Sequence, residues 1–140
     1  MQGEDEPVST DTFTESAALK RLNPSVKVIM ALGGWSFNNN DTIWQPVFGD
    51  LASTKEKRTK FFGKVEDFLT TYGFDGIDID WEYPGAGDRG GHKGDGENYT
   101  KLLKELRVAF DKHEGRELSF TAPTSYWVGC AYRIAFNPLC

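Results

Sequence analysis

The sequence has 140 residues, a net charge of −5 and 39% hydrophobic residues, which is enough apolar chain for one modest core and predicts one domain. The acidic balance argues against nucleic acid or an anionic membrane as a partner, because phosphate binding needs clustered Lys and Arg. No apolar run is long enough to cross a bilayer, and the polar residues 1–14 lack the layout of a signal peptide and predict a flexible lead-in.

The first predicted elements are a helix and a strand. Residues 15–22 carry several apolar side chains and then meet Asn23-Pro24, where the residue before proline is pushed out of the helical region. These residues therefore predict the last turns of a helix. Residues 26–32 (VKVIMAL) form a nearly continuous apolar run before Gly33-Gly34, which predicts a strand buried on both faces.

A polar segment and a second helix come next. Residues 35–50 are Asn-rich and predict a loop, although several aromatic residues are interspersed in it. The run Ser53-Thr54-Lys55-Glu56 is a capping box that predicts the start of a helix. Apolar residues then recur at the spacing of one helical face, and Gly73 is placed to end this helix as a C-terminal cap.

An acidic strand follows at residues 74–84 (FDGIDIDWEYP). Asp78, Asp80 and Glu82 alternate with apolar residues, so a strand would place the three carboxylates on one face and Trp81 on the other, packed against helices. In an antiparallel sheet this pattern would indicate only a wet, half-exposed acidic face. The neighbouring elements decide between the two interpretations.

Those neighbours predict parallel strands. A glycine-rich loop at 85–96, an amphipathic helix at 99–110 and a strand at 118–122 complete the order strand, helix, strand, helix, strand. This order predicts an α/β fold, with parallel strands joined by right-handed helical crossovers, as in part of a (β/α)8 barrel. The carboxylates would then point into the interior near the catalytic mouth. Like charges there resist joint ionisation, so at least one should keep its proton near neutral pH.

The acidic strand also carries a family resemblance. Asp75-Gly76-Ile77-Asp78-Ile79-Asp80-Trp81-Glu82 resembles the D-x-x-D-x-D-x-E signature of glycoside hydrolase family 18, the chitinases, and looks most like their fungal, secreted type. Residues 27–35 resemble the third strand of that family's TIM barrel, and residues 118–127 resemble the fifth. The resemblance covers residues 15–127 and implies a partial catalytic domain with about strands 3 to 5.

The resemblance implies a retaining, substrate-assisted hydrolysis of β-1,4-linked N-acetylglucosamine in chitin or chitooligosaccharides. It implies that Glu82 protonates the leaving oxygen, that Asp80 orients the substrate acetamido group, and that Asp78 shares a proton with Asp80. Asp75 matches the first, mainly structural acid of the motif. The resemblance also implies no cofactor, no metal and an extracellular location.

Four aromatic residues are candidates for substrate binding: Trp35, Tyr83, Tyr126 and Trp127. A pyranose ring packs its apolar face on an aromatic side chain, and Trp35 and Tyr83 match the family's positions. Each of the four could instead belong to the core, and for Tyr126 and Trp127 the two interpretations stay open.

The chain departs from the family in two respects. Ala31 replaces the serine of the family's S-x-G-G motif, so one hydroxyl that could support the acidic residues is absent. Strands begin near Val26, Phe74 and Leu118, so eight such units would need well over the roughly 250 residues typical of the barrel. We therefore expect a truncated form or an internal fragment, with 128–140 a divergent tail such as read-through of an unspliced intron would give.

Other functions are weighed against this interpretation. A chitin-binding, chitinase-like lectin would lose the proton donor, whereas Glu82 is present. An endo-β-N-acetylglucosaminidase shares the acidic motif and stays open. A calcium loop counted from Asp78 would place Tyr83 where glycine is needed. His92 and His113 are expected to be solvated.

The only two cysteines, Cys130 and Cys140, match no metal-ligand spacing. A short-loop disulfide between them stays open.

Overall fold

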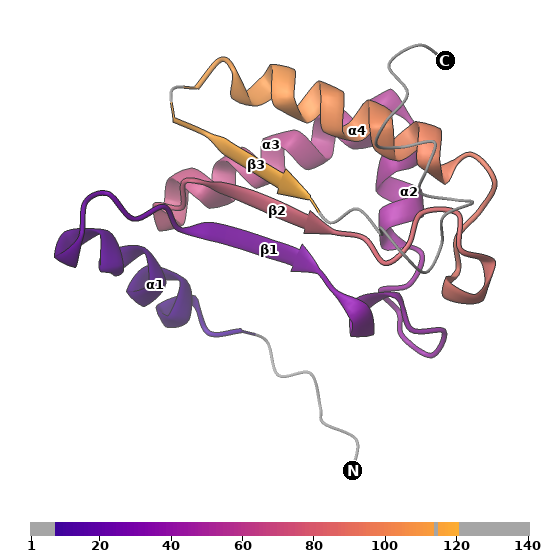
Figure 1. The fold of residues 1–140 in the computed structure, drawn as a ribbon, viewed down its shortest axis with the longest axis horizontal. Helices are drawn as coiled ribbons and strands as arrows, with labels where there is room; N and C mark the ends of the chain where they lie inside the picture. Colours follow the sequence, from indigo (N-terminus) through magenta and orange to yellow (C-terminus); the bar gives the residue numbers. More distant parts are fainter. Residues whose placement is uncertain (1–7, 114, 121–140) are drawn as a thin grey trace.

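The computed structural model describes residues 8–113 and 115–120, in which three parallel strands form one sheet in the order β1-β2-β3. The strands are β1 (Ile29–Gly33), β2 (Gly76–Asp80) and β3 (Glu117–Phe120) (Figure 1). The predicted parallel α/β arrangement is confirmed. Residues 121 and 122 of the predicted third strand lie outside the described residues, as do Tyr126, Trp127 and the 128–140 tail.

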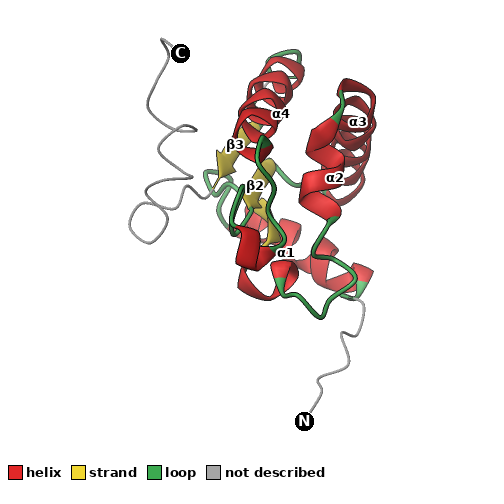
Figure 2. Ribbon diagram, turned by 90° about the vertical axis from the view of Figure 1, so that its right-hand side faces the viewer, coloured by secondary structure: helices red, strands yellow, loops and turns green. Residues whose placement is uncertain are grey.

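Helices cover one face of this sheet. The helices α2 (Val47–Ser53), α3 (Lys55–Tyr72) and α4 (Asp95–Phe110) lie over β2 and its neighbours (Figure 2), while α1 (Thr10–Leu22) packs beside α3. Two short 3-10 turns, Trp35–Asn38 and Gly87–Arg89, follow β1 and β2 in the loops at the ends of the strands. No described helix is long and apolar enough to cross a membrane.

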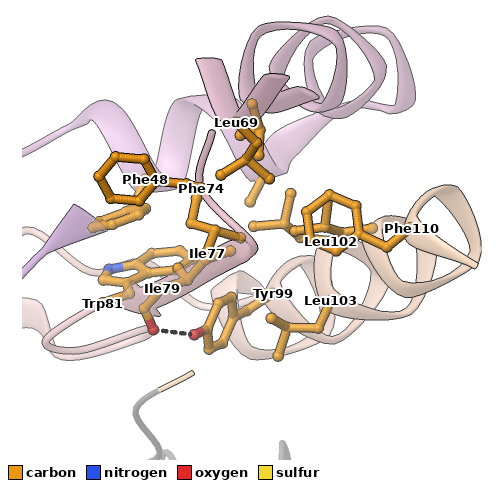
Figure 3. Packing of buried hydrophobic residues seen from close by; sticks show 13 residues of the cluster. Phe48, Leu69, Phe74, Ile77, Ile79, Trp81, Tyr99, Leu102, Leu103 and Phe110 are labelled. Carbon is orange, nitrogen blue, oxygen red and sulfur yellow. Dashed lines mark hydrogen bonds between the residues drawn. The ribbon is translucent and has the colours of Figure 1, made fainter. Parts of the chain in front are cut away.

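The core lies between the sheet and the helices (Figure 3). Ile77 and Ile79 of β2 are fully buried there with Leu69 of α3 and Leu102 of α4. Trp81 is 2% exposed and belongs to the same cluster, which confirms the prediction that it faces the helices. Because alternate residues of a strand point to opposite faces, this packing fixes the other face of β2 as the side that carries Asp78 and Asp80.

Two helices, α1 and α3, begin at other residues than predicted. The helix α1 begins at Thr10, so residues 10–14 are helical and do not belong to a flexible lead-in. Ser9 caps this helix by accepting a hydrogen bond from the Asp11 amide, 3.2 Å away. The capping box predicted at Ser53 is displaced by one residue, because Thr54 is the N-cap of α3 and accepts from the Lys57 amide. Gly73 ends α3 in the left-handed region at φ 76°, as predicted.

The first strand and the segment after it also differ. The strand β1 is not buried on both faces, because Ala31 is exposed on the side that no described helix covers. The predicted loop at 35–50 contains the beginning of α2, whose Phe48 and Ala52 are fully buried. Seven residues are too few for a helical repeat to stand out from the sequence.

Candidate active site

Three acidic side chains gather at the carboxyl end of β2. Asp78 and Asp80 are half-buried on the face of β2 that points away from the helices, and Glu82 follows two residues after the strand ends. The register places Asp78 between Ala31 of β1 and Ser119 of β3. The carboxyl ends of parallel strands are where α/β enzymes place their reactive groups. We call these three residues the acidic face.

Glu82 and Asp80 interact directly. Burial raises the pKa of the Glu82 carboxyl, and the negative charge of Asp80 and a hydrogen bond between the two side chains raise it further. Asp80 Oδ1 is buried, and no N–H or O–H group of the described residues donates a hydrogen bond to it. A buried oxygen without a donor is costly, so this arrangement favours a proton on Glu82 that is donated toward the Asp80 carboxylate. The upward direction of the Glu82 pKa is the one that a retained proton on one of the three acids requires.

A serine supports the inner end of the acidic face. The Ser119 hydroxyl donates a hydrogen bond to Asp78 Oδ1 at 2.7 Å. The residues next to Ser119 in the sequence do not indicate this role, because the contact crosses from β3 to β2 and depends on the strand register. Ser119 thus supplies Asp78 with a hydroxyl partner on one side, while Ala31 on the other side offers none.

Two glycines bring Trp35 to the acidic face. Gly33 and Gly34 have φ values of 114° and 94°, and a Cβ atom on Gly33 would clash with the carbonyl oxygen of Asp80. The Gly34 amide donates to that carbonyl at 2.9 Å. Only glycine allows this close approach at these backbone angles, and Trp35 follows immediately with 58% of its surface exposed.

The remaining predicted aromatic residue in the described part is Tyr83. It is half-buried, and its side chain forms a hydrogen bond with Glu82 that partly offsets the raised pKa of the Glu82 carboxyl. Burial and the charge of Glu82 raise the pKa of the Tyr83 hydroxyl. The structure therefore brings together Trp35, Tyr83, Asp80 and Glu82, while Tyr126 and Trp127 lie outside the described residues.

Asp75 lies away from the acidic face. Its carboxylate accepts hydrogen bonds from the Val28 amide at 2.8 Å and from Lys20 Nζ at 3.1 Å. Partial burial opposes the charge, but these two partners outweigh it and lower the pKa of the Asp75 carboxyl. The contacts join the start of β2 to α1 and to the residue before β1, and they support the structural role that the motif implies.

Replacing Asp75 with asparagine is expected to lower the free energy of unfolding by about 1–3 kcal/mol at pH 7, because two hydrogen bonds to a charged acceptor are weakened. The folded-state pKa is depressed, so the stabilisation is present above the unfolded value of about 3.9 and is lost as the pH falls through the folded value. Urea unfolding at pH 7 and at low pH checks this. Asp50→Asn, which removes an exposed pair with Lys57, is the control, and an equal loss for Asp75→Asn at both pH values would contradict the account.

No group of three or more His, Cys, Asp or Glu residues within the described part of the chain is arranged to hold a metal ion. His92 and His113 are both exposed, as predicted.

Comparisons with known proteins agree on one family. The model of "Glycosyl hydrolases family 18" matches residues 1–136. An endochitinase of Manduca sexta is 38% identical over 117 residues, which are 83% of this chain and 20% of that protein. The Group IV chitinase of Ostrinia furnacalis, solved in complex with allosamidin, is 35% identical with a TM-score of 0.70 over 81% of this chain and 28% of that one.

A further solved structure is catalytic domain 2 of the Ostrinia furnacalis Group II chitinase, a mutant in complex with penta-N-acetylchitooctaose. It is 32% identical, with a TM-score of 0.74 over 89% of this chain and 31% of that chain. The chain thus spans about a fifth of the length of the Manduca sexta relative and less than a third of the chain in each of these two structures.

Proposed function

Since this chain belongs to family 18 of the glycosyl hydrolases, we propose that its acidic face is the catalytic part of a chitinase that cleaves β-1,4-linked N-acetylglucosamine polymers with retention of configuration. The observation that carries the proposal is the raised pKa of the Glu82 carboxyl beside the buried Asp80 oxygen. A glutamate whose pKa is raised keeps its proton to a higher pH than an ordinary carboxyl group does, which suits it to act as a general acid.

In this mechanism Glu82 donates its proton to the glycosidic oxygen that leaves. On the other side of the scissile bond, the acetamido carbonyl oxygen of the sugar attacks the anomeric carbon of the same sugar. The bond from this carbon to the leaving oxygen breaks. Asp80 accepts a hydrogen bond from the acetamido N–H through its carboxylate and stabilises the cationic oxazolinium that forms. Water then attacks the anomeric carbon and opens the oxazolinium ring. The water gives a proton back to Glu82, and the product keeps the anomeric configuration of the substrate.

The other acids and the aromatic residues have supporting roles. Asp78, held by Ser119 at 2.7 Å, shares a proton with Asp80 and tunes its charge. The exposed indole of Trp35 stacks on a sugar ring next to the scissile bond, and Tyr83 contacts Glu82. No step needs a cofactor, and we place the reaction outside the cell, where polymeric chitin is found.

The proposal is tested with the protein that contains these residues, on N-acetylglucosamine oligomers and, separately, on an N-glycosylated peptide. We expect new reducing ends from the oligomers, with the β-anomer formed first in ¹H NMR, and no change with a chelator. Cleavage of the glycopeptide alone would instead support an endo-β-N-acetylglucosaminidase. Binding of oligomers without any cleavage would support a chitin-binding lectin, and initial formation of the α-anomer would contradict the mechanism.

A further inference from the structure

The glycine-rich loop after β2 contains a buried cation that the proposed mechanism does not use. Arg89 is 9% exposed, and within the described residues its guanidinium group donates hydrogen bonds to uncharged acceptors. Its Nε donates to the Glu82 carbonyl oxygen at 3.2 Å, its Nη1 donates to Asn39 Oδ1 at 2.8 Å, and its Nη2 donates to the Trp35 carbonyl oxygen. One side chain therefore connects the segment of the general acid with the segment that follows β1.

The same guanidinium group lies over the Trp35 ring. The distance from Arg89 Cζ to the ring centroid is 3.9 Å, well inside the range of a cation–π interaction. Trp35 still has 58% of its surface exposed. Arg89 thus contacts both the carbonyl group and the ring of Trp35, while much of the indole remains open to a ligand.

The loop is built to hold the arginine in this position. Gly90 follows it at φ 73°, and a Cβ atom there would lie 2.6 Å from the side chain of Gln45. The Gly91 amide donates to the Ala86 carbonyl at 2.8 Å, and a Cβ atom on Gly91 would clash with the Ala86 amide. Gly90 therefore lets the loop pack against Gln45, and Gly91 lets the loop close on its own backbone at Ala86, with Arg89 held between these contacts.

We propose that Arg89 is a positioning residue, which fixes the Trp35 indole at a set place and orientation relative to Glu82 so that a bound sugar ring stacks beside the proton donor. The inference rests on the proposed function, because it assigns Arg89 a task in binding the same oligosaccharide. Arg89 itself need not touch the substrate. A planar guanidinium with several directed donors suits this task, whereas a lysine ammonium is a point charge that cannot reproduce the geometry.

The test compares Arg89→Met and Arg89→Lys with the unaltered protein on N-acetylglucosamine oligomers. We expect Arg89→Met to raise KM about tenfold with kcat changed less than about threefold, since loss of an interaction that acts in binding changes KM alone. Arg89→Lys should give an intermediate KM. Arg107→Met is the matched control, because Arg107 also lies over a ring, that of Phe110 at 5.8 Å, but on the helical side; its KM should not change.

A double-mutant cycle separates positioning from general damage. If Arg89 acts through the indole, Arg89→Met should raise KM no further when Trp35→Ala is already present. Circular dichroism and the midpoint of thermal unfolding identify any variant that fails to fold, and the Lys variant then carries the comparison.

If Arg89→Met raised KM as much in the Trp35→Ala protein as in the protein that keeps Trp35, the inference would be overturned. An unchanged KM in a folded Arg89→Met protein would overturn it too. An unaltered protein that neither binds nor cleaves the oligomers would refute the proposed function itself, and with it the role of Trp35 on which the inference rests.

Discussion

Replacing Glu82 with glutamine is expected to lower kcat for chitooligosaccharide hydrolysis by about 10²–10⁴-fold, the usual contribution of a positioned general acid. Glutamine has nearly the same shape but no proton to donate to the leaving oxygen. Its amide can still contact Asp80 and Tyr83, which both interact with Glu82 in the structure. KM should therefore change little, and isothermal titration with an oligomer should show that binding is retained.

The control for this variant is Glu97→Gln, which neutralises an exposed glutamate in the first turn of α4. It changes the net charge equally and should leave kcat unaltered. Turnover by the Glu82→Gln protein equal to that of the unaltered protein would show that another group donates the proton. A large loss in both variants would point to a general electrostatic effect instead.

Replacing Trp81 with alanine is expected to destabilise the fold by about 3–5 kcal/mol, the range for truncating a buried aromatic residue. The Trp81 ring stacks on Phe48 of α2 with centroids 5.5 Å apart and meets Tyr99 of α4 edge-on at 5.3 Å. It thereby joins the end of β2 to two helices, so its loss opens a cavity directly behind the acidic face. Such a loss is a large fraction of a domain's total stability.

Chemical unfolding followed by circular dichroism measures this effect. Trp44→Ala is the matched control, because Trp44 is 44% exposed and contacts Phe37 at 6.0 Å in the loop before α2. The midpoint for Trp81→Ala should fall far below that of the control. Equal midpoints for the two variants would show that the packing around Trp81 does not stabilise the sheet.

The acidic strand was the most predictable part of the site. Alternation of Ile77 and Ile79 with Asp78 and Asp80 was enough to predict which side chains point to the helices and which point away, because a strand has a period of two. The order of strands and helices then predicted the parallel pairing. Both predictions depend on local pattern and connectivity, which a sequence displays directly.

Contacts between distant segments could not be predicted in the same way. The bond from Ser119 to Asp78 depends on the register of two strands that are joined through a whole helix. Arg89 stands among glycines and another charged residue, a context typical of a solvated loop, yet it is buried against Trp35. Neither burial nor partner is encoded in the residues next to these positions.

Helix starts were missed for a different reason. The helix α2 has no side-chain cap, since Pro46 occupies its N-cap position, so the signal that usually marks a helix start is absent. Two adjacent hydroxyl residues precede α3, and either could be its N-cap by residue type. In the structure Thr54 is the N-cap of α3, and Ser53 is the last residue of α2.

The pairing of Asp80 with Glu82 is tested most directly by an NMR titration of the Glu82 carboxyl carbon in the unaltered protein and in Asp80→Asn. Burial is the largest cause of the raised pKa of Glu82, and the charge of Asp80 is the second. We therefore predict a pKa for Glu82 above the ordinary value of 4.5, and a lower pKa when Asp80 is neutralised. The alkaline limb of the pH profile of kcat should move to lower pH in parallel. A pKa at or below the ordinary value, or one that Asp80→Asn leaves unchanged, would contradict the account.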